Sequence, residues 1–354
     1  MSPLPQYRKY VAVLVLAAVA GSAALNGCSR TPQYEGRSRA HFDGVRFSNT
    51  LSAEKSVVDI FDFMSTFWLR KETWPDWVEN GDYAPPPKAE DAIVATFINH
   101  STVLLQLGGV NVLTDPIWAE RASPFSFAGP RRVREAGLAI DELPPIDVIV
   151  ISHDHYDHLD IEALQRLQHR GRAQQPLVLA GLGNGGLLKS IGLNRFQELD
   201  WGDEIVVDGV TISFVEVRHR SGRGLTSQMK TLWGGFVINS PQGRVYFAGD
   251  TGYGPHFHEA REHFGRFDLS LVPIGAYRPR SFMAPVHLDP EHAVRAHRDL
   301  GSKQSLAVHH GTFQLTYEAI DEPYRELAKA LASAGLPERE FRVLGFGESM
   351  VVRQ

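Results

Sequence analysis

The sequence predicts an α/β protein, in which strands and helices alternate along most of the chain. Short apolar runs interleave with helical patterns from about residue 91 to the C-terminus, and no segment repeats at a fixed period. The 354 residues are 43% hydrophobic and 22% charged, an ordinary globular composition that suffices for one large domain or two. The alternation by itself leaves the α/β and α+β classes both open.

Individual elements can be placed from their periodicity and their turn residues. Short apolar runs are expected to be strands, and Gly108-Gly109 supplies a hairpin turn between two of them. Segments with apolar residues at helical spacing are expected to be helices, two of which begin near a proline. The expected strands are 93–98, 103–107, 110–113, 148–151, 210–217, 232–238, 245–248, 269–274 and 306–308; the expected helices are 161–167, 290–300 and 323–334.

Charge and cysteine content exclude two classes of protein. The net charge is −5, from 36 basic and 41 acidic residues, whereas a nucleic-acid-binding protein normally carries a basic excess. Cys28 is the only cysteine, so no intramolecular disulfide can form. We therefore expect no nucleic-acid partner and no disulfide scaffold, while a monomer and a homo-oligomer both stay open.

Residues 1–27 have the pattern of a secretory signal peptide. Two basic residues precede an apolar run over 11–20, which is shorter than the ~20 residues of a membrane span. The following Leu25-Asn-Gly-Cys28 resembles the lipobox of bacterial lipoproteins, in which cleavage precedes a cysteine that carries the lipid. The alternative is a simple N-terminal anchor helix with a buried cysteine.

The lipobox resemblance implies a location for the mature protein. Cleavage before Cys28 removes two basic residues and no acidic ones, so the net charge becomes −7 (34 − 41). Ser29, rather than aspartate, follows the cysteine, which argues against retention in an inner membrane. We expect a lipid-anchored protein of the bacterial cell envelope, at the periplasmic face of the outer membrane.

Residues 28–90 are expected to form a tether and an aromatic N-terminal segment. Residues 29–39 are polar and suit a flexible connection. Aromatic residues are dense over 57–77, with a spacing that fits an amphipathic helix ending near Trp74-Pro75. This segment either packs on the main domain as a cover or contacts lipid. The Ala84-Pro-Pro-Pro87 run marks a boundary, so the compact domain is expected over 91–354.

Three histidines and two aspartates lie within six residues, directly after the expected strand 148–151. The run Ser152-His-Asp-His-Tyr-Asp-His158 is not a packing motif, because burying so many unpaired ionisable groups would be costly. Imidazole and carboxylate together are ligands for zinc, iron or manganese. His219, Asp250 and His309 follow three other expected strands. Four strand ends with this composition predict one metal centre at a common rim.

These motifs resemble the metallo-β-lactamase superfamily, whose metal motif is His-x-His-x-Asp-His. The finer resemblance is to the N-acyl-phosphatidylethanolamine-hydrolysing phospholipase D family, and it extends from about Asp91 to the C-terminus. It implies a four-layer αβ/βα sandwich with a binuclear metal site at one edge of two sheets. The matching blocks, in family order, are Leu113-Thr-Asp-Pro116, Arg121-Ala-Ser-Pro124, Gly129-Pro-Arg-Arg132, Leu143-Pro-Pro-Ile-Asp147, 152–160, Leu232-Trp-Gly234, Phe247-Ala-Gly-Asp-Thr-Gly-Tyr253, Pro273-Ile-Gly-Ala-Tyr277, His287-Leu-Asp-Pro-Glu291 and His309-His-Gly-Thr-Phe313.

The resemblance assigns a metal role to seven residues and implies two divalent ions. Zn²⁺ is the expected metal, since the ligands offer nitrogen and oxygen and no redox chemistry is required. One ion is expected to be held by His153, His155 and His219, and the other by Asp157, His158 and His309, with Asp250 bridging the two.

Other residues receive supporting roles from the same resemblance. Asp115 is expected to orient the histidine loop from behind the ligands. His100 is expected to be a buried, hydrogen-bonded support, and His287 to lie near the substrate. His310, where animal members of the family have tryptophan, is a competing ligand beside His309. The histidines expected to have no ligand role are His41, His169, His256, His258, His263, His292 and His297.

The resemblance implies hydrolysis of a phosphodiester bond. The expected substrate is N-acyl phosphatidylethanolamine, giving an N-acylethanolamine and phosphatidic acid, with Asp157, Asp250 and His287 as the catalytic residues. A phospholipid and the membrane reached by the lipid anchor are the expected partners. One alternative is a lactonase or other metallo-hydrolase of soluble esters, which would share every ligand. A second is a noncatalytic lipid-binding lipoprotein, which should lack part of the ligand set.

Overall fold

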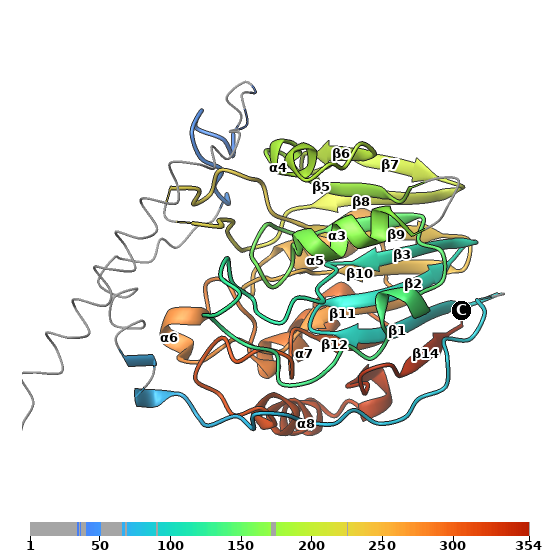
Figure 1. Cartoon of the computed structure of the whole chain (residues 1–354). Helices are drawn as coiled ribbons and strands as arrows, with labels where there is room; N and C mark the ends of the chain where they lie inside the picture. The colour runs from blue at the N-terminus through green and yellow to red at the C-terminus, as the bar shows by residue number, and fades with distance from the viewer. Residues whose placement is uncertain are drawn as a thin grey trace, which may run out of the picture.

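The structure, a computed structural model, describes residues 34, 36, 40–50, 66–67, 69–89, 91–170, 175–224 and 226–353. The expected signal peptide, Cys28 and most of the aromatic segment lie outside these residues. Two seven-stranded sheets stack face to face, and helices cover both outer faces (Figure 1). No helix within the described ranges is long and apolar enough to cross a membrane.

The first sheet combines an antiparallel half with a parallel half. Its order is β14-β1-β2-β3-β4-β5-β6, antiparallel from β14 to β3 and parallel from β3 to β6. Gly108 and Gly109 turn β2 into β3 with φ of 62° and 79°, the left-handed backbone that a two-residue type I′ turn requires. The strands are β1 (Ile93–Asn99), β2 (Thr102–Leu107), β3 (Val110–Thr114), β4 (Val148–Ile151), β5 (Leu177–Gly181), β6 (Phe196–Leu199) and β14 (Ser349–Val352).

The second sheet has the same mixed construction. Its order is β13-β12-β11-β10-β9-β8-β7, antiparallel from β7 to β10 and parallel from β10 to β13. Because β8 and β10 both run antiparallel to β9, the carboxyl ends of β8, β10, β11 and β12 lie at one edge. The strands are β7 (Glu204–Val207), β8 (Val210–Val215), β9 (Gly235–Ser240), β10 (Gly243–Phe247), β11 (Leu269–Pro273), β12 (Gln304–Val308) and β13 (Phe341–Arg342).

Three buried apolar clusters hold the layers together. One lies between the sheets and includes Phe97 of β1 and Phe236 of β9. The second joins the second sheet to α5 (His256–Phe264), α7 (Pro290–Leu300) and α8 (Glu322–Ala334). The third joins the first sheet to α3 (Ile161–Gln168), α4 (Gly185–Ser190) and the 3₁₀ turn η1 (Ile140–Glu142). Two further short helices are α6 (Arg280–Met283) and η2 (Glu338–Glu340). The expected four-layer αβ/βα sandwich is confirmed.

A short N-terminal stretch enters the core between the sheets. Phe42 and Phe47 are 2% and 0% exposed and belong to the inter-sheet cluster. His41 Nε2 donates to Asp200 Oδ1 at 2.7 Å, and the Phe47 N–H donates to the Met229 carbonyl at 2.7 Å. Residues 40–50, for which no packing role was predicted, are therefore part of the folded body.

Most expected elements are found, with three informative differences. The expected strand 232–238 begins only at Gly235, because the N–H groups of Leu232 and Gly234 donate to loop carbonyls of Leu182 and Ser152 rather than to a strand. The expected strand 210–217 ends at Val215. Helical backbone in the aromatic segment ends at Arg70, not near Trp74-Pro75, because the Glu72 N–H donates to Tyr317 instead of continuing a helix.

Candidate metal centre

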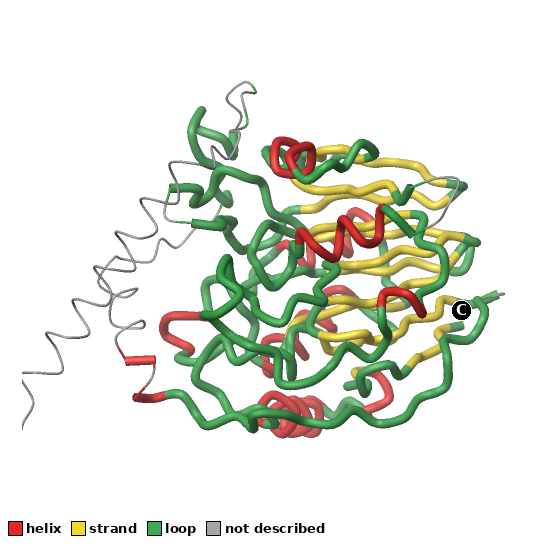
Figure 2. Tube along the Cα trace, in the orientation of Figure 1, coloured by secondary structure: helices red, strands yellow, loops and turns green. Residues whose placement is uncertain are grey.

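The candidate metal centre lies at one edge of the two sheets, where the carboxyl ends of the strands that precede the candidate ligands meet. Figure 2 shows the long loops gathered at this end of the strands. In the first sheet, His100 follows β1, Asp115 follows β3 and the His153–His158 loop follows β4. In the second sheet, His219, Asp250 and His309 follow β8, β10 and β12. The strand directions therefore bring residues separated by up to 209 positions (309 − 100) to one place.

Three imidazoles form the first ligand group. His153 Nε2 lies 2.8 Å from His155 Nδ1, which lies 3.3 Å from His219 Nε2. These atoms are close enough together to share one metal ion. Burial lowers the pKa of His153 and of His219 well below the usual range, and also that of His155. The three rings are therefore neutral, which is the form that binds a metal.

The second ligand group mixes imidazole and carboxylate. Asp157 Oδ2 lies 3.4 Å from both His158 Nε2 and His309 Nε2. Burial opposes charge on these histidines, but Asp250 and Asp157 outweigh it and raise the pKa of His309 to about 9 and that of His158 well above its ordinary value. The carboxylates therefore favour positive charge on these two histidines. The same negative charge would favour a bound cation.

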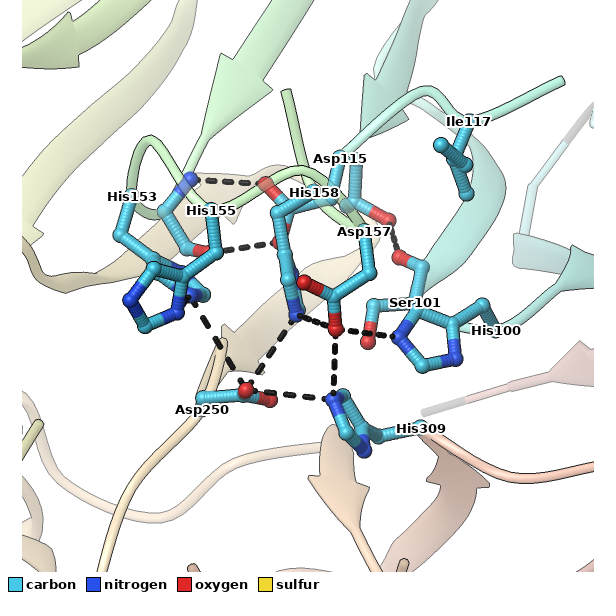
Figure 3. A network of polar contacts seen from close by, with 12 residues as sticks. His100, Ser101, Asp115, Ile117, His153, His155, Asp157, His158, Asp250 and His309 are labelled. Atoms are coloured by element: carbon cyan, nitrogen blue, oxygen red, sulfur yellow. Dashed lines mark hydrogen bonds and ion pairs between the residues drawn. The ribbon is translucent and has the colours of Figure 1, made fainter. Parts of the chain in front are cut away.

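Asp250 lies between the two groups (Figure 3). Its Oδ2 is 3.1 Å from His309 Nε2 and 3.3 Å from His158 Nε2 on one side. On the other side the same oxygen is 3.8 Å from His219 Nε2 and 3.9 Å from His153 Nε2. One carboxylate oxygen therefore faces ligands of both groups, which is the position expected of a bridging residue.

Asp115 orients one histidine of each group. His158 Nδ1 donates to Asp115 Oδ2 at 2.6 Å, so its Nε2 faces the site. The Ser152 hydroxyl donates to the same carboxylate at 2.6 Å and is itself 2.9 Å from His153 Nδ1, which donates to it. Asp115 therefore fixes the ring orientation of His158 directly and that of His153 through Ser152, a support role typical of residues behind metal ligands.

The other expected site residues also converge here. His100 Nε2 donates to Asp157 Oδ2 at 3.0 Å, and its ring stays neutral because burial lowers its pKa to about 3. His287 Nδ1 is 3.8 Å from Asp250 Oδ2 at a partly open edge of the site. His310 turns away, with Nδ1 3.0 Å from the Tyr324 hydroxyl and its ring stacked on Phe97, so it does not compete with His309 for a metal.

The backbone at the site adopts conformations that are unusual for its residues. His100, Asp115 and His309 have φ of 46°, 32° and 59°, which non-glycine residues seldom adopt and which cost about 1–3 kcal/mol each. Gly249, with φ of 56°, allows the chain to pass Ser152, because a Cβ at residue 249 would lie 2.6 Å from the Ser152 Cβ. The hydrogen bonds around Asp115 and His100 stabilise this strained arrangement.

Unpartnered polar atoms test whether the residues fit a metal. His158 Nε2, His309 Nε2 and Asp250 Oδ1 are buried, yet none has a hydrogen-bond partner among the described residues. Buried polar atoms are normally paired, and these three point into the space between the two ligand groups (Figure 3). A divalent cation would satisfy them, so the donor set fits a metal ion.

Three residues that support the site were not predicted from the sequence. The Asn49 side chain accepts from the His219 N–H at 3.2 Å, and no motif surrounds it that could have revealed this contact. Asp160 accepts from the N–H groups of Trp118 and Ala119 and also caps α3, a role that its place before an apolar helix could have indicated. Arg223 lies 3.9 Å above the Tyr156 ring and donates to the Asp154 and Leu159 carbonyls, which fixes the histidine loop.

Comparison with known proteins identifies the family of the chain. A family profile described as "Beta-lactamase superfamily domain" matches residues 110–310. N-acyl-phosphatidylethanolamine-hydrolyzing phospholipase D 1 of Caenorhabditis elegans is 38% identical over 270 residues, which are 73% of this chain and 76% of that protein. The mitochondrial protein of the same name from Saccharomyces cerevisiae is 32% identical over 251 residues, 69% of this chain and 53% of that protein.

Solved structures show the same fold. An isothiocyanate hydrolase from Delia radicum gut bacteria superposes with a TM-score of 0.59 at 22% identity, covering 73% of this chain and 99% of that one. Three observations indicate the same family: the His and Asp residues at the strand ends, the profile match and the identity to the nematode protein. The chain belongs to the metallo-β-lactamase superfamily of metal-dependent hydrolases, and within it to the N-acyl-phosphatidylethanolamine-hydrolysing phospholipase D family.

Proposed function

We propose that this protein is a binuclear phosphodiesterase of the phospholipase D type, acting on N-acyl phosphatidylethanolamine. The observation that carries the binuclear assignment is the position of Asp250 Oδ2, within 3.1–3.9 Å of ligand nitrogens from both groups. The substrate assignment is supported by the names of the nematode and yeast relatives. The products would be an N-acylethanolamine and phosphatidic acid.

The residues proposed to hold the metal are those of the two ligand groups. His153, His155 and His219 would hold one ion, Asp157, His158 and His309 the other, and Asp250 both, with Zn²⁺ suited to these nitrogen and oxygen donors. Two divalent ions at such a site lower the pKa of water towards ~7 and neutralise developing charge on a phosphoryl group.

The chain's own residues would then position the substrate and move protons. Asp115 and His100 hold the ligand rings and the Asp157 carboxylate in fixed orientations. Asp157 and Asp250 are kept ionised, because the surrounding histidines outweigh the effect of burial and lower the pKa of each carboxyl well below its usual range. We assign His287, at the open edge beside Asp250, to contact with the phosphate or protonation of the leaving oxygen.

Isotope labelling tests the proposed reaction. Zinc-loaded protein should be incubated with long-chain N-acyl phosphatidylethanolamine in water enriched in ¹⁸O, and the products analysed by mass spectrometry. We expect ¹⁸O in phosphatidic acid and none in the N-acylethanolamine, because attack occurs at phosphorus. Label in a released fatty acid, or opening of acyl lactones without phosphodiester cleavage, would instead support an acyl hydrolase or lactonase.

We also propose that Cys28 carries a lipid that anchors the mature protein at the periplasmic face of the outer membrane. The lipobox resemblance supports this location, which would keep the enzyme beside a phospholipid substrate. In cells supplied with labelled fatty acid, Cys28→Ala protein should remain unlabelled and uncleaved before residue 28. Normal labelling of that variant would contradict the anchor.

A further inference from the structure

A buried carboxylate lies in the loop that follows His309. Glu318 is only 4% exposed. The guanidinium of Arg278, whose backbone lies beside it, pairs instead with Glu322 and Glu326. Burying a carboxylate costs several kcal/mol unless hydrogen bonds satisfy its oxygens. The donors that Glu318 does engage therefore indicate what it is there to hold.

Four hydrogen-bond donors converge on the Glu318 carboxylate. Oε1 accepts from the N–H groups of Ala276 and Tyr277 at 2.6 and 3.3 Å. Oε2 accepts from the Arg278 N–H at 3.2 Å and from the Thr316 hydroxyl. Three of the four donors are consecutive backbone N–H groups of one loop. Glu318 therefore fixes the path of that loop and not a single side chain.

The loop that Glu318 holds has a strained backbone. It follows β11 at the edge of the sheet where the ligand groups lie, yet residues 274–278 include no His, Asp or Glu. Ala276 has a φ of 59°, a left-handed conformation that costs a non-glycine residue about 1–3 kcal/mol. Such strain persists only where the surrounding structure enforces it, and the bonds to Glu318 provide that enforcement here.

The same loop packs against the turn that presents His309. A Cβ at Gly275 would lie 2.1 Å from the His309 carbonyl oxygen, so glycine lets the two backbones touch. The Ile274 N–H also donates to the Val308 carbonyl at 3.1 Å. On the other side, the His309 N–H donates to the His100 carbonyl at 2.7 Å. The His309 turn is therefore held between the end of β1 and the loop that Glu318 fixes.

Glu318 also joins the N-terminal segment to this place. The Trp74 indole N–H donates to the Glu318 carbonyl at 2.8 Å, and the Glu72 N–H donates to the Tyr317 carbonyl at 2.8 Å. Trp74, Glu318 and His309 all line one small cavity. Three segments that are distant in the sequence therefore meet at Glu318, next to a ligand of the second group.

We propose that Glu318 is a positioning residue for the second ligand group, which it serves by holding loop 275–278 against the His309 turn. The inference rests on the proposed function and adds the residue that keeps its second ion in place. His309 Nε2 lies 3.1 Å from Asp250 Oδ2 and 3.4 Å from Asp157 Oδ2, so a shift of the turn changes both distances. The effect of Glu318 should therefore appear as metal affinity.

Stepwise zinc affinity, measured by competition with a chelator, tests the proposal without turnover. Glu318→Gln replaces one accepting oxygen with an N–H donor, which cannot pair with the donors that Oε1 and Oε2 now engage. The matched control is Asp268→Asn. Asp268 lies directly before β11 and accepts from the Arg244 N–H at 2.8 Å, so it makes the same type of contact at the opposite end of the strand. Asp157→Asn, which alters the second ligand group directly, identifies the binding step of that group.

We expect Glu318→Gln to weaken the step that Asp157→Asn weakens, by about tenfold to a hundredfold, the range for residues that support metal ligands. The other step should not change, and Asp268→Asn should bind both ions as wild type does. Zinc should also raise the unfolding temperature of Glu318→Gln by less than that of wild type, because stabilisation by a ligand follows its affinity. A lower unfolding temperature of Glu318→Gln with both zinc steps unchanged would show a purely structural role and overturn the inference.

A milder variant keeps the test decisive if Glu318→Gln does not fold. Thr316→Val removes only the hydroxyl that donates to Glu318 Oε2 and preserves the shape of the side chain. It should weaken the same zinc step by a smaller factor. Unchanged affinity at that step would overturn the inference.

The same measurements separate this inference from the proposed function. If wild type binds two ions and Glu318→Gln binds both equally well, only the role of Glu318 fails. If wild type binds two ions but cleaves no phosphodiester, the proposed function fails, while a weakened step in Glu318→Gln still supports its positioning role. If wild type binds one ion only, the binuclear assignment fails, and equal affinity of Glu318→Gln for that ion would overturn the role of Glu318 as well.

Discussion

The Asn49 side chain accepts a hydrogen bond from the backbone N–H of His219, 170 positions further along the chain, at 3.2 Å. The Asn49 amide donates to the Val217 carbonyl at 2.7 Å, and the Trp233 indole N–H reaches the Asn49 oxygen at 3.3 Å. A residue near the N-terminus therefore fixes the backbone that presents a ligand. Phe42 and Phe47, buried in the inter-sheet core, hold this stretch in place.

Asn49→Ala should weaken both the fold and the first ligand group. The substitution leaves the buried His219 N–H without a partner and removes one of the two donors to the Val217 carbonyl, the other being the Trp233 indole N–H; an unsatisfied buried group costs about 1–3 kcal/mol. Urea unfolding and competition with a zinc chelator measure the two effects. Asn80→Ala, which removes a single bond from Asn80 to the Glu135 carbonyl elsewhere in the N-terminal segment, should change zinc affinity little. Equal zinc affinity in both variants would argue against this role of Asn49.

Asp250→Asn should abolish the loading of two ions per chain. Mass spectrometry of metal content should give close to two ions per wild-type chain. The variant should lose this loading and nearly all activity, because it lacks the negative charge that faces both ligand groups. Asp208→Asn makes the same change in the β7–β8 turn, where φ of 48° suits asparagine, and should retain both ions. No more than one ion per wild-type chain under metal-replete conditions would contradict a binuclear site.

Asp115→Asn should weaken both metal positions together. An asparagine cannot accept from Ser152 N–H, the Ser152 hydroxyl and His158 Nδ1 at once, as the carboxylate does at 2.6–2.7 Å. Loss of such a supporting residue typically lowers metal affinity about 10–100-fold. Zinc titration against a competing chelator measures the affinity of each of the two ion-binding steps. Weakening of one step alone would show that Asp115 supports only one ligand group.

His287→Ala should lower turnover while both ions stay bound. His287 lies at the partly open edge, 3.8 Å from Asp250, and general acid catalysis contributes about 10²–10⁴-fold. Kinetics and metal content are measured on the same preparation. His263→Ala, at an exposed position of α5, should alter neither quantity. A parallel loss of metal would make His287 a ligand rather than a catalytic residue.

His256 should lower the free energy of unfolding of the protein at acidic pH. Burial, with a smaller effect from Arg218, lowers its pKa from 6.5 to about 3. Between these values the unfolded chain binds a proton that the native state excludes, so stability falls as the pH decreases below 6.5. His256→Gln should remove about 1.4 kcal/mol of this loss at pH 5.5, measured by urea unfolding at fixed zinc concentration. A pH dependence that is the same in His256→Gln and wild type would show that His256 does not cause the loss.

The sequence by itself determined which residues are candidates for the metal centre. The run from Ser152 to His158 and the candidate ligands after β8, β10 and β12 could be identified because short apolar runs mark strands, and because so many ionisable groups in one run would be costly to bury unpaired. The four-layer class followed from the same motifs through the family resemblance. Elements with strong local signals, such as the helix Pro290–Leu300, were placed to the residue.

Only the tertiary structure decided how those residues act together. His309 and His310 are adjacent and chemically identical, but a φ of 59° at His309 directs one ring to Asp250 and leaves the other against Tyr324. The contact of Asn49 with His219 has no local signature. It depends on how distant loops meet at the edge of two sheets, and local sequence does not encode that arrangement because the two segments are brought together only by the strand order.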